Sequence, residues 1–133
     1  MALDVDSLDD DVLAFLRERH LATLTTLRED GSPHVVAVGF SYDADAKVAR
    51  VITWATSQKA VNAGRMQAAG QRAAVCQVDG GRWLALEGRV RLVTDAAGVR
   101  PGIDGYAERY QEPKDRDDRA VVEIDVDRIL GRG

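Results

Sequence analysis

The chain has 133 residues, of which 45% are hydrophobic and 30% charged, a balance typical of one soluble globular domain over residues 1–133. Its formal net charge of −4 argues against a general nucleic-acid binder, because such proteins usually present a basic face. With Cys76 as the only cysteine, no internal disulfide or cysteine-rich zinc site can form, so we expect no metal and a reducing, cytoplasmic setting. No apolar run approaches the roughly 20 residues of a membrane span, so we expect neither a signal peptide nor a membrane anchor.

The first half of the chain predicts one helix followed by three strands. Apolar residues recur at helical spacing over residues 7–19, and Ser7 precedes a run of acidic residues as a helix cap would. The Asp-Gly pair at residues 30–31 supplies the positive φ that a hairpin turn requires. Because the connecting turns are too short for crossovers, we expect an antiparallel meander of strands over residues 21–28, 33–42 and 48–54.

Two further helices are predicted in the second half. One spans residues 57–69, with Gly70 as its end signal. The other lies in a segment with helical spacing over residues 95–110. Because Pro101 and Gly102 interrupt this pattern, we expect only a short helix near residues 103–110.

Three further strands are predicted over residues 72–79, 82–93 and 119–129, and Gly88 within the second of them indicates a bulge or a bend. Six or more mostly antiparallel strands with few helices predict a mainly β protein, a small barrel or half-barrel whose openings the helices cover. No glycine-rich motif links a strand to a helix in the pattern of a Rossmann fold or a P-loop, so neither nucleotide-binding class is expected.

The segment from Arg50 to Asn62 is the most informative for function, because a strand leads there through a short polar loop into a helix start. Ser57 and Lys59 lie at that start, where unpaired backbone N–H groups and the helix dipole favour anions. Lysine is also rare in this chain, with three lysines among 18 basic residues. The segment therefore predicts a phosphate site, with Arg50 and Arg65 as secondary candidates; a capping serine beside a solvated lysine is the alternative.

Four other residues carry possible chemistry. His34 titrates near neutrality and is a candidate for touching a ligand or donating a proton, whereas a strand histidine satisfied by the backbone is the alternative. Cys76 lies in an apolar strand and is expected to be a buried structural thiol. Arg82 and Trp83 follow a glycine turn, where a planar cation beside an indole suits a carboxylate on a conjugated ligand; Trp83 in the core of a dimer is the alternative.

The chain resembles the split β-barrel flavin and deazaflavin oxidoreductases related to pyridoxamine 5′-phosphate oxidase, and within them it is most similar to the F420-dependent biliverdin reductases. The Ser-Pro-His run at residues 32–34 and the strand that follows are shared by the superfamily and indicate the fold. Two runs are more selective, Ser-Gln-Lys-Ala-Val-Asn at residues 57–62 and Cys-Gln-Val-Asp-Gly-Gly-Arg-Trp at residues 76–83. The resemblance covers nearly the whole chain and departs at residues 98–105, where glycine and proline replace an expected regular helix.

The resemblance implies a homodimer with two equivalent grooves between its subunits, each binding coenzyme F420. The cofactor phosphate is expected near Ser57 and Lys59 and its ring against the second and third strands, while Gln77 and Trp83 come from either subunit. Arg82 is expected to hold the propionates of the substrate. The cofactor-binding residues implied in this way are His34, Val36, Val38, Arg50, Ile52, Thr53, Ser57, Lys59, Asn62, Gln77 and Trp83.

The activity that the resemblance implies is hydride transfer from reduced F420 to a conjugated acceptor, the tetrapyrrole biliverdin, which yields bilirubin. The protein would supply position and electrostatics, because the cofactor carries the hydride chemistry. The sequence offers no donor for the accompanying proton beyond His34 or water. Two alternatives stay open: an FMN-dependent oxidase or reductase of the same superfamily, and a non-catalytic flavin or tetrapyrrole carrier.

Overall fold

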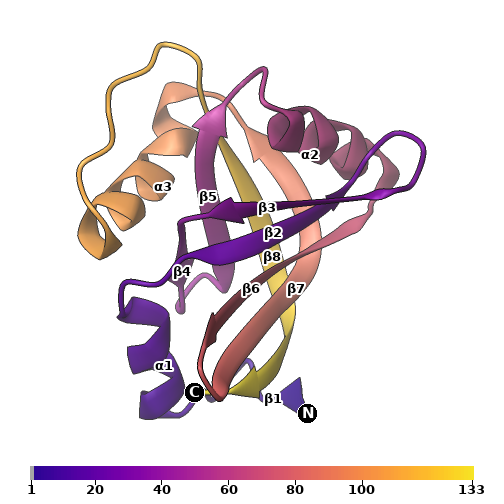
Figure 1. The fold of residues 1–133 in the computed structure, drawn as a ribbon. Coiled ribbons are helices and arrows are strands. Elements are labelled where there is room, and N and C mark those ends of the chain that lie inside the picture. Colours follow the sequence, from indigo (N-terminus) through magenta and orange to yellow (C-terminus); the bar gives the residue numbers. More distant parts are fainter. Residues whose placement is uncertain (1) are drawn as a thin grey trace.

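The structure, a computed structural model, describes residues 2–133 as one eight-stranded antiparallel sheet curled into a half-barrel with three helices around it (Figure 1). This confirms the mainly β architecture predicted from the sequence. The strand order is β3-β2-β6-β7-β8-β5-β4, and β1 pairs with β8. The strands are β1 (Ala2–Leu3), β2 (Ala22–Leu27), β3 (Pro33–Val38), β4 (Phe40–Asp43), β5 (Val48–Trp54), β6 (Arg72–Asp79), β7 (Arg82–Val93) and β8 (Arg119–Arg132). The helices are α1 (Asp10–Arg17), α2 (Gln58–Ala69) and α3 (Ala96–Arg109).

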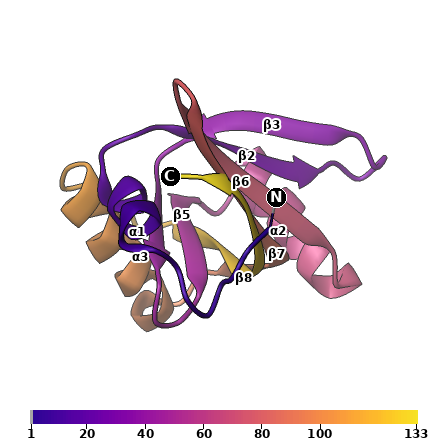
Figure 2. The ribbon, with the colours of Figure 1, turned by 90° about the horizontal axis from the view of Figure 1, so that it is seen from below.

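The long strands β7 and β8 form the curved back of the half-barrel, and the hairpin of β2 and β3 crosses in front of β5 (Figures 1 and 2). Helices α1 and α3 lie beside β4, while α2 packs against β7 (Figure 1). Alternate side chains of each strand point into the half-barrel and make its core. The largest fully buried side chains include Phe15, Leu24, Phe40, Met66, Leu84, Leu86, Ile124 and Ile129.

Several elements form where local sequence signals predicted them. Strands β6 and β7 have the predicted bounds, and their register shifts between Glu87 and Gly88, which confirms the bulge. Helix α2 begins directly after Ser57 and ends at Gly70, whose φ of 66° is the left-handed conformation that glycine adopts without strain. The last strand extends beyond its predicted end because Arg132 still pairs with the beginning of β7.

The single strand predicted over residues 33–42 is wrong, because Gly39 divides it into β3 and β4 at opposite edges of the sheet. Gly39 lies under two tyrosines of the α3 region, and a Cβ there would stand 3.0 Å from Tyr106 Cε2 and 3.1 Å from Tyr110 Cε2. The Phe40 N–H donates to the Tyr110 hydroxyl at 3.2 Å. The predicted three-strand meander is therefore two separate hairpins, β2–β3 and β4–β5.

The first and last helices also differ from the prediction. Helix α1 starts at Asp10 and Ser7 does not cap it, because the Ser7 N–H donates to the Asp4 carbonyl (3.1 Å) in a preceding turn. Helix α3 runs unbroken through Pro101 and Gly102, longer than the predicted span. Tertiary packing outweighs the poor helix propensity there.

Close packing against the sheet explains why glycine is useful in α3. A Cβ on Gly102 would lie 2.8 Å from a methyl group of Val121, and one on Gly105 would lie 2.4 Å from the Ser41 hydroxyl oxygen. The two glycines thus let the helix backbone approach β4 and β8 directly. The Asp95 side chain starts the helix by accepting the Gly98 N–H at 2.8 Å.

Within residues 2–133, none of the helices has the length and the apolar composition needed to cross a membrane.

Gly88 at the bulge gives a direct test of this fold. A Cβ at this position would lie 1.7 Å from the backbone oxygen of Asp125, so Gly88→Ala should destabilise the protein by about 2–3 kcal/mol or more. At Gly64 in α2 a Cβ would meet only Leu92, at an ordinary 3.5 Å, so Gly64→Ala should stabilise by about 0.5–1 kcal/mol. Urea unfolding of both variants measures the difference, and a harmless Gly88→Ala would contradict the bulge geometry.

Candidate functional site

A groove of about 510 Å³ opens where β5 ends and α2 begins, which is the segment that the sequence indicated. Its walls come from the end of β3, from β5, α2 and α3, and from the loop over residues 111–118. The lining residues are Ala37, Val38, Gly39, Ile52, Lys59, Tyr106, Gln111, Glu112, Pro113, Lys114 and Arg119. Among the predicted cofactor residues, Val38, Ile52 and Lys59 therefore share one cavity.

Ser57 acts as the cap of α2. Its hydroxyl oxygen accepts the Ala60 N–H at 3.2 Å and forms a hydrogen bond of 2.7 Å with the Thr53 hydroxyl, and both side chains are buried. The first N–H groups of a helix lack partners within the helix. The Ser57 side chain caps the N–H of Ala60, so the N–H groups of Gln58 and Lys59 still lack a partner within the helix. The helix start therefore keeps its anion-attracting backbone groups, although the Ser57 side chain is already engaged inside the protein.

Lys59 is a positive group of the groove, and it comes from the helix start itself. Its side chain is half-buried, and this burial lowers the pKa of the ammonium group. Within the described residues 2–133 no carboxylate pairs with Lys59, and its Nζ lies 5.1 Å from the centre of the Trp54 ring. A cation that is partly desolvated and unpaired attracts an anion more strongly than one on an open surface.

Two further cations line the groove. The Arg119 guanidinium donates to the carbonyl oxygens of Thr53 (3.3 Å) and Lys114 (2.5 Å), which fixes the loop over residues 111–118 to β5. Lys114 and Arg119 both line the groove, with Glu112 as its one acidic residue. The balance of charge in the groove is therefore positive, although the whole chain has a net charge of −4.

His34, Val36 and Val38 alternate along β3 and so share one face of that strand, next to the groove. The Nδ1 atom of His34 is buried and has no hydrogen-bond partner among the described residues 2–133. Burial lowers the pKa of His34, and the charges of Arg28 and Lys59 lower it further. The imidazole is thus neutral at pH 7 and suited to hydrogen bonding with a ligand, and it is a weak candidate for a proton donor.

Asn62, Gln77 and Arg50 have partners inside the protein. Asn62 is buried and donates to the Thr26 hydroxyl at 3.1 Å, which holds α2 against β2. Gln77 is buried and donates to the Phe15 carbonyl at 3.1 Å. Arg50 pairs with Glu123 (3.0 Å) and Asp43 (3.3 Å), and it lines a separate cavity between α1, β4 and α3.

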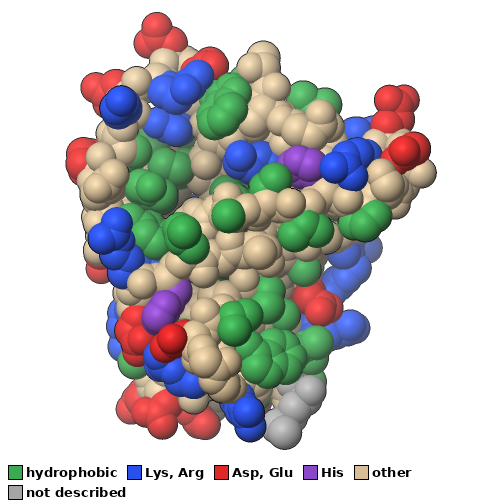
Figure 3. All heavy atoms as spheres, viewed as in Figure 1, with side chains coloured by type: hydrophobic (Ala, Val, Ile, Leu, Met, Phe, Trp, Pro, Cys, Tyr) green, Lys and Arg blue, Asp and Glu red, His purple; other side chains and the backbone are tan. Residues whose placement is uncertain are grey.

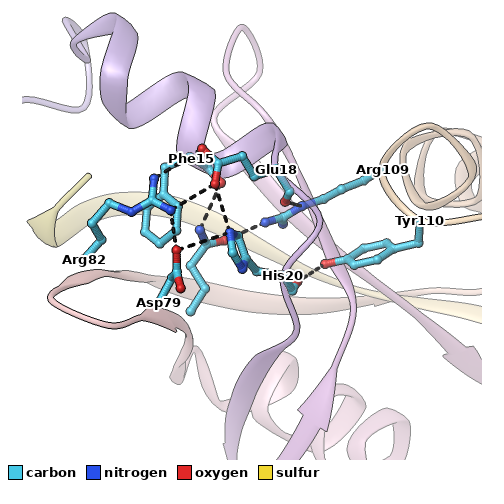
Figure 4. Close-up of polar contacts among 8 residues, drawn as sticks. Phe15, Glu18, His20, Asp79, Arg82, Arg109 and Tyr110 are labelled. Atoms are coloured by element: carbon cyan, nitrogen blue, oxygen red, sulfur yellow. Dashed lines mark hydrogen bonds and ion pairs between the residues drawn. The ribbon is translucent and has the colours of Figure 1, made fainter.

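Arg82 lies in a polar cluster at the C-terminal end of α1, which is outside the groove (Figure 4). Its guanidinium donates to both carboxylate oxygens of Glu18 at 3.0 and 3.2 Å, binds Asp79, and stacks on the Phe15 ring at 4.2 Å. The hydrogen bond from Arg82, followed by that from His20, lowers the pKa of Glu18 to about 2. Within one chain, the predicted substrate-binding arginine is therefore already neutralised by two carboxylates.

Arg109 and Tyr110 were not singled out from the sequence, yet they join α1, β4 and β6 beside the corner at Gly39. Arg109 is 9% exposed, and its guanidinium donates to the Glu18 carbonyl (2.7 Å), the Phe40 carbonyl (2.8 Å) and Gln77 Oε1 (2.8 Å). The Tyr110 hydroxyl donates to the His20 carbonyl at 2.6 Å (Figure 4). A lone arginine near the end of a helix carries no sequence signal for such a role, because its acceptors lie in distant segments.

The outward face of β2, β3, β6 and β7 is largely apolar. Leu21, Val35 and Val78 are 68%, 57% and 61% exposed, and Trp83 joins them at the start of β7. Figure 3 shows hydrophobic side chains across this front face, over β2, β3 and the lower parts of β6 and β7. Cys76 is half-buried on the same face, and burial raises the pKa of its thiol, which agrees with a structural cysteine.

The half-barrel with its three flanking helices defines the chain as a split β-barrel protein. It belongs to the pyridoxamine 5′-phosphate oxidase family, whose model matches residues 8–133. This confirms the family expected from the sequence.

Individual relatives agree with this assignment. The chain is 54% identical over 124 residues to an F420H2-dependent biliverdin reductase of Mycobacterium tuberculosis, covering 93% of this chain and 88% of the relative. Two solved structures, each 24% identical, share the fold. One is a conserved hypothetical protein of Mycobacterium tuberculosis, with a TM-score of 0.76 and coverage of 95% of this chain and 85% of the other. The second is an F420 reductase, with a TM-score of 0.70 and coverage of 93% and 98%.

The lowered pKa of Glu18 predicts a titration experiment. Arg82→Ala removes the largest cause, so the Glu18 pKa should rise from about 2 toward its ordinary value of about 4.5. Because the folded-state pKa lies below the unfolded one, any stability from this group is present above pH 4.5 and is lost as the pH falls through about 2. Carboxyl-carbon NMR measures the pKa directly. Arg128→Ala, which removes a partner of Glu87 instead, is the control, and a Glu18 pKa unchanged by Arg82→Ala would contradict the ion pair.

Proposed function

We propose that this protein is an F420H2-dependent biliverdin reductase, in which a groove at the start of α2 binds the cofactor through its phosphate. The observation that carries the proposal is the unpaired, half-buried ammonium group of Lys59 in that groove. The 54% identity to a relative that bears this name supports the choice of cofactor and acceptor, because it extends over 93% of the chain.

The residues of the groove fit the expected cofactor. Lys59 and the free N–H groups at the start of α2 would hold the phosphate, and the cap formed by Ser57 and Thr53 keeps those N–H groups aligned. Val38 and Ile52 offer an apolar wall for a flat ring. The unpartnered Nδ1 of His34 supplies a hydrogen-bonding group next to that wall. When bound, reduced F420 supplies the hydride.

The chain itself contributes position and charge. The cations that line the groove attract the negatively charged cofactor and hold it in one orientation. Because the pKa of His34 lies below its ordinary value, the imidazole is mostly unprotonated at pH 7 and is a poor acid. We therefore assign the proton of the reduction to water. We also propose that the protein works in the cytoplasm, where a reducing environment keeps Cys76 as a thiol.

We propose a homodimer formed through the apolar outward face of β2, β3, β6 and β7. In one chain Arg82 and Trp83 lie away from the groove, so they can reach a cofactor only across a subunit boundary, whereas Gln77 is fully buried within its own chain. A contact through this face would bury four exposed apolar side chains, which supports the choice of this face. They are Leu21, Val35, Val78 and Trp83.

Val35→Asp tests the dimer. A charge in the middle of the apolar face should convert the dimer into a monomer and weaken cofactor binding with it. Val61→Asp, at an exposed position of α2 outside this face, is the matched control and should leave the dimer intact. Sedimentation equilibrium gives the mass of each; a wild-type monomer at micromolar concentration would end the proposal.

Anaerobic turnover tests the function. Mixing the protein with reduced F420 and biliverdin should regenerate oxidised F420 and produce bilirubin in equal amounts, followed by their separate absorbance bands. Lys59→Ala should raise the Kd for F420 about tenfold or more, since a charge-assisted hydrogen bond is lost. Lys47→Ala removes a lysine that pairs with Asp6 in a distant turn and should bind normally.

The alternatives give different results in the same assay. Tighter binding of FMN than of F420 would identify an FMN-dependent enzyme of the family instead. Binding of F420 or a tetrapyrrole without any reoxidation of the reduced cofactor would identify a carrier. A Kd that changes less than about twofold in Lys59→Ala would show that the phosphate lies elsewhere.

A further inference from the structure

Trp54, at the end of β5, contacts two cations that come from different parts of the chain. The Lys59 ammonium of α2 lies 5.1 Å from the centre of its ring, and the Arg116 guanidinium of the following loop lies 5.0 Å from it. Trp54 is 39% exposed, so part of its side chain remains accessible. Two like charges repel each other, whereas the negative face of an indole attracts both.

Backbone contacts fix Trp54 at the meeting point of three elements. It pairs with Arg119 in the ladder between β5 and β8, and its carbonyl accepts the Ser57 N–H at 3.1 Å, directly before α2. The next residue, Ala55, donates its N–H to the Asp118 carbonyl of the loop at 2.8 Å. The end of β5 therefore sets the position of the ring. Lys59 belongs to a wall of the groove, and Arg116 belongs to the loop that forms another wall.

The chemistry of the two contacts explains why an aromatic ring suits this position. A carboxylate beside Lys59 would hold the ammonium but would also compete with an anionic ligand for it. The indole restrains the ammonium and leaves its charge available, so less side-chain freedom is lost when an anion binds. Arg116 also pairs with Asp118 at 2.8 Å, so the ring links Lys59 to a loop that is already internally fixed.

We propose that Trp54 is a positioning residue for the anion site: it holds Lys59 and the loop over residues 111–118 in the geometry that receives the phosphate. This inference rests on the proposed function, because it takes Lys59 as the group that meets the cofactor. It assigns Trp54 no contact with the reacting atoms.

A double-mutant cycle measured by F420 titration tests the inference. Trp54→Leu should raise the Kd about fivefold, and Trp54→Phe, which keeps an aromatic face, should stay within about twofold of the wild type. In a Lys59→Ala background, Trp54→Leu should have a clearly smaller effect on the Kd, because only its contact with Arg116 of the loop is then left to lose. At saturating cofactor the kcat of Trp54→Leu should equal that of the wild type. A general structural defect would lower the kcat as well as weaken binding.

The outcomes separate the two proposals. An unchanged Kd in Lys59→Ala overturns the phosphate site itself and the role of Trp54 with it. A raised Kd in Lys59→Ala combined with a normal Kd in Trp54→Leu overturns only the positioning role, as does an equal effect of Trp54→Leu in both backgrounds. Dissociation of Trp54→Leu into monomers, seen by sedimentation, would make the exposed ring a subunit contact and would likewise overturn the inference.

Discussion

Arg109 ties together the parts of the structure that have to meet beside the groove. Its guanidinium joins the C-terminal end of α1, the first residue of β4 and the middle of β6 through three acceptors, all of them uncharged. A buried cation is unfavourable unless its N–H groups are satisfied, so this arrangement forms only when all three segments are in place. Tyr110, the next residue, adds a hydrogen bond to the carbonyl of His20. The chain turns from β3 to β4 at Gly39, which packs under the same helix end. Gly39 and Tyr106 both line the groove, so this corner forms part of its wall.

Some charged side chains of the protein form ion pairs with each other, whereas others line the groove. Within residues 2–133 seven arginines have carboxylate partners, among them Arg50, Arg72, Arg82 and Arg91. The exposed pairs among them add little stability individually. Lys59 differs because an aromatic ring, and no acid, lies beside it. An overall negative protein can thereby keep one locally positive groove for an anion.

Local signals in the sequence were sufficient for much of the fold. The Ser57 cap and the Gly70 end signal act within a few residues, and α2 follows them. Strands β6 and β7 also have their predicted bounds, and the glycine at position 88 marked the bulge, although the bulge itself forms against β8. The division of residues 33–42 at Gly39 was missed because its cause is a pair of tyrosines about 70 residues further along. The full length of α3 was missed for a similar reason, since its packing against β4 and β8 outweighs the proline and glycine signals. For the site, Lys59 and its helix start could be read locally, whereas Arg82 and Gln77 depend on partners that the sequence does not identify.

The contact between Gly39 and Tyr106 restricts how the groove can change in evolution. Any side chain at position 39 would push Tyr106 away and widen the groove, because a Cβ there would stand only 3.0 Å from that ring. The same displacement would loosen the corner at which the sheet folds back on itself. The width of the groove and the closure of the sheet are therefore linked through a single backbone position. Variation in the shape of the groove should instead accumulate in the loop over residues 111–118, which forms another part of its lining.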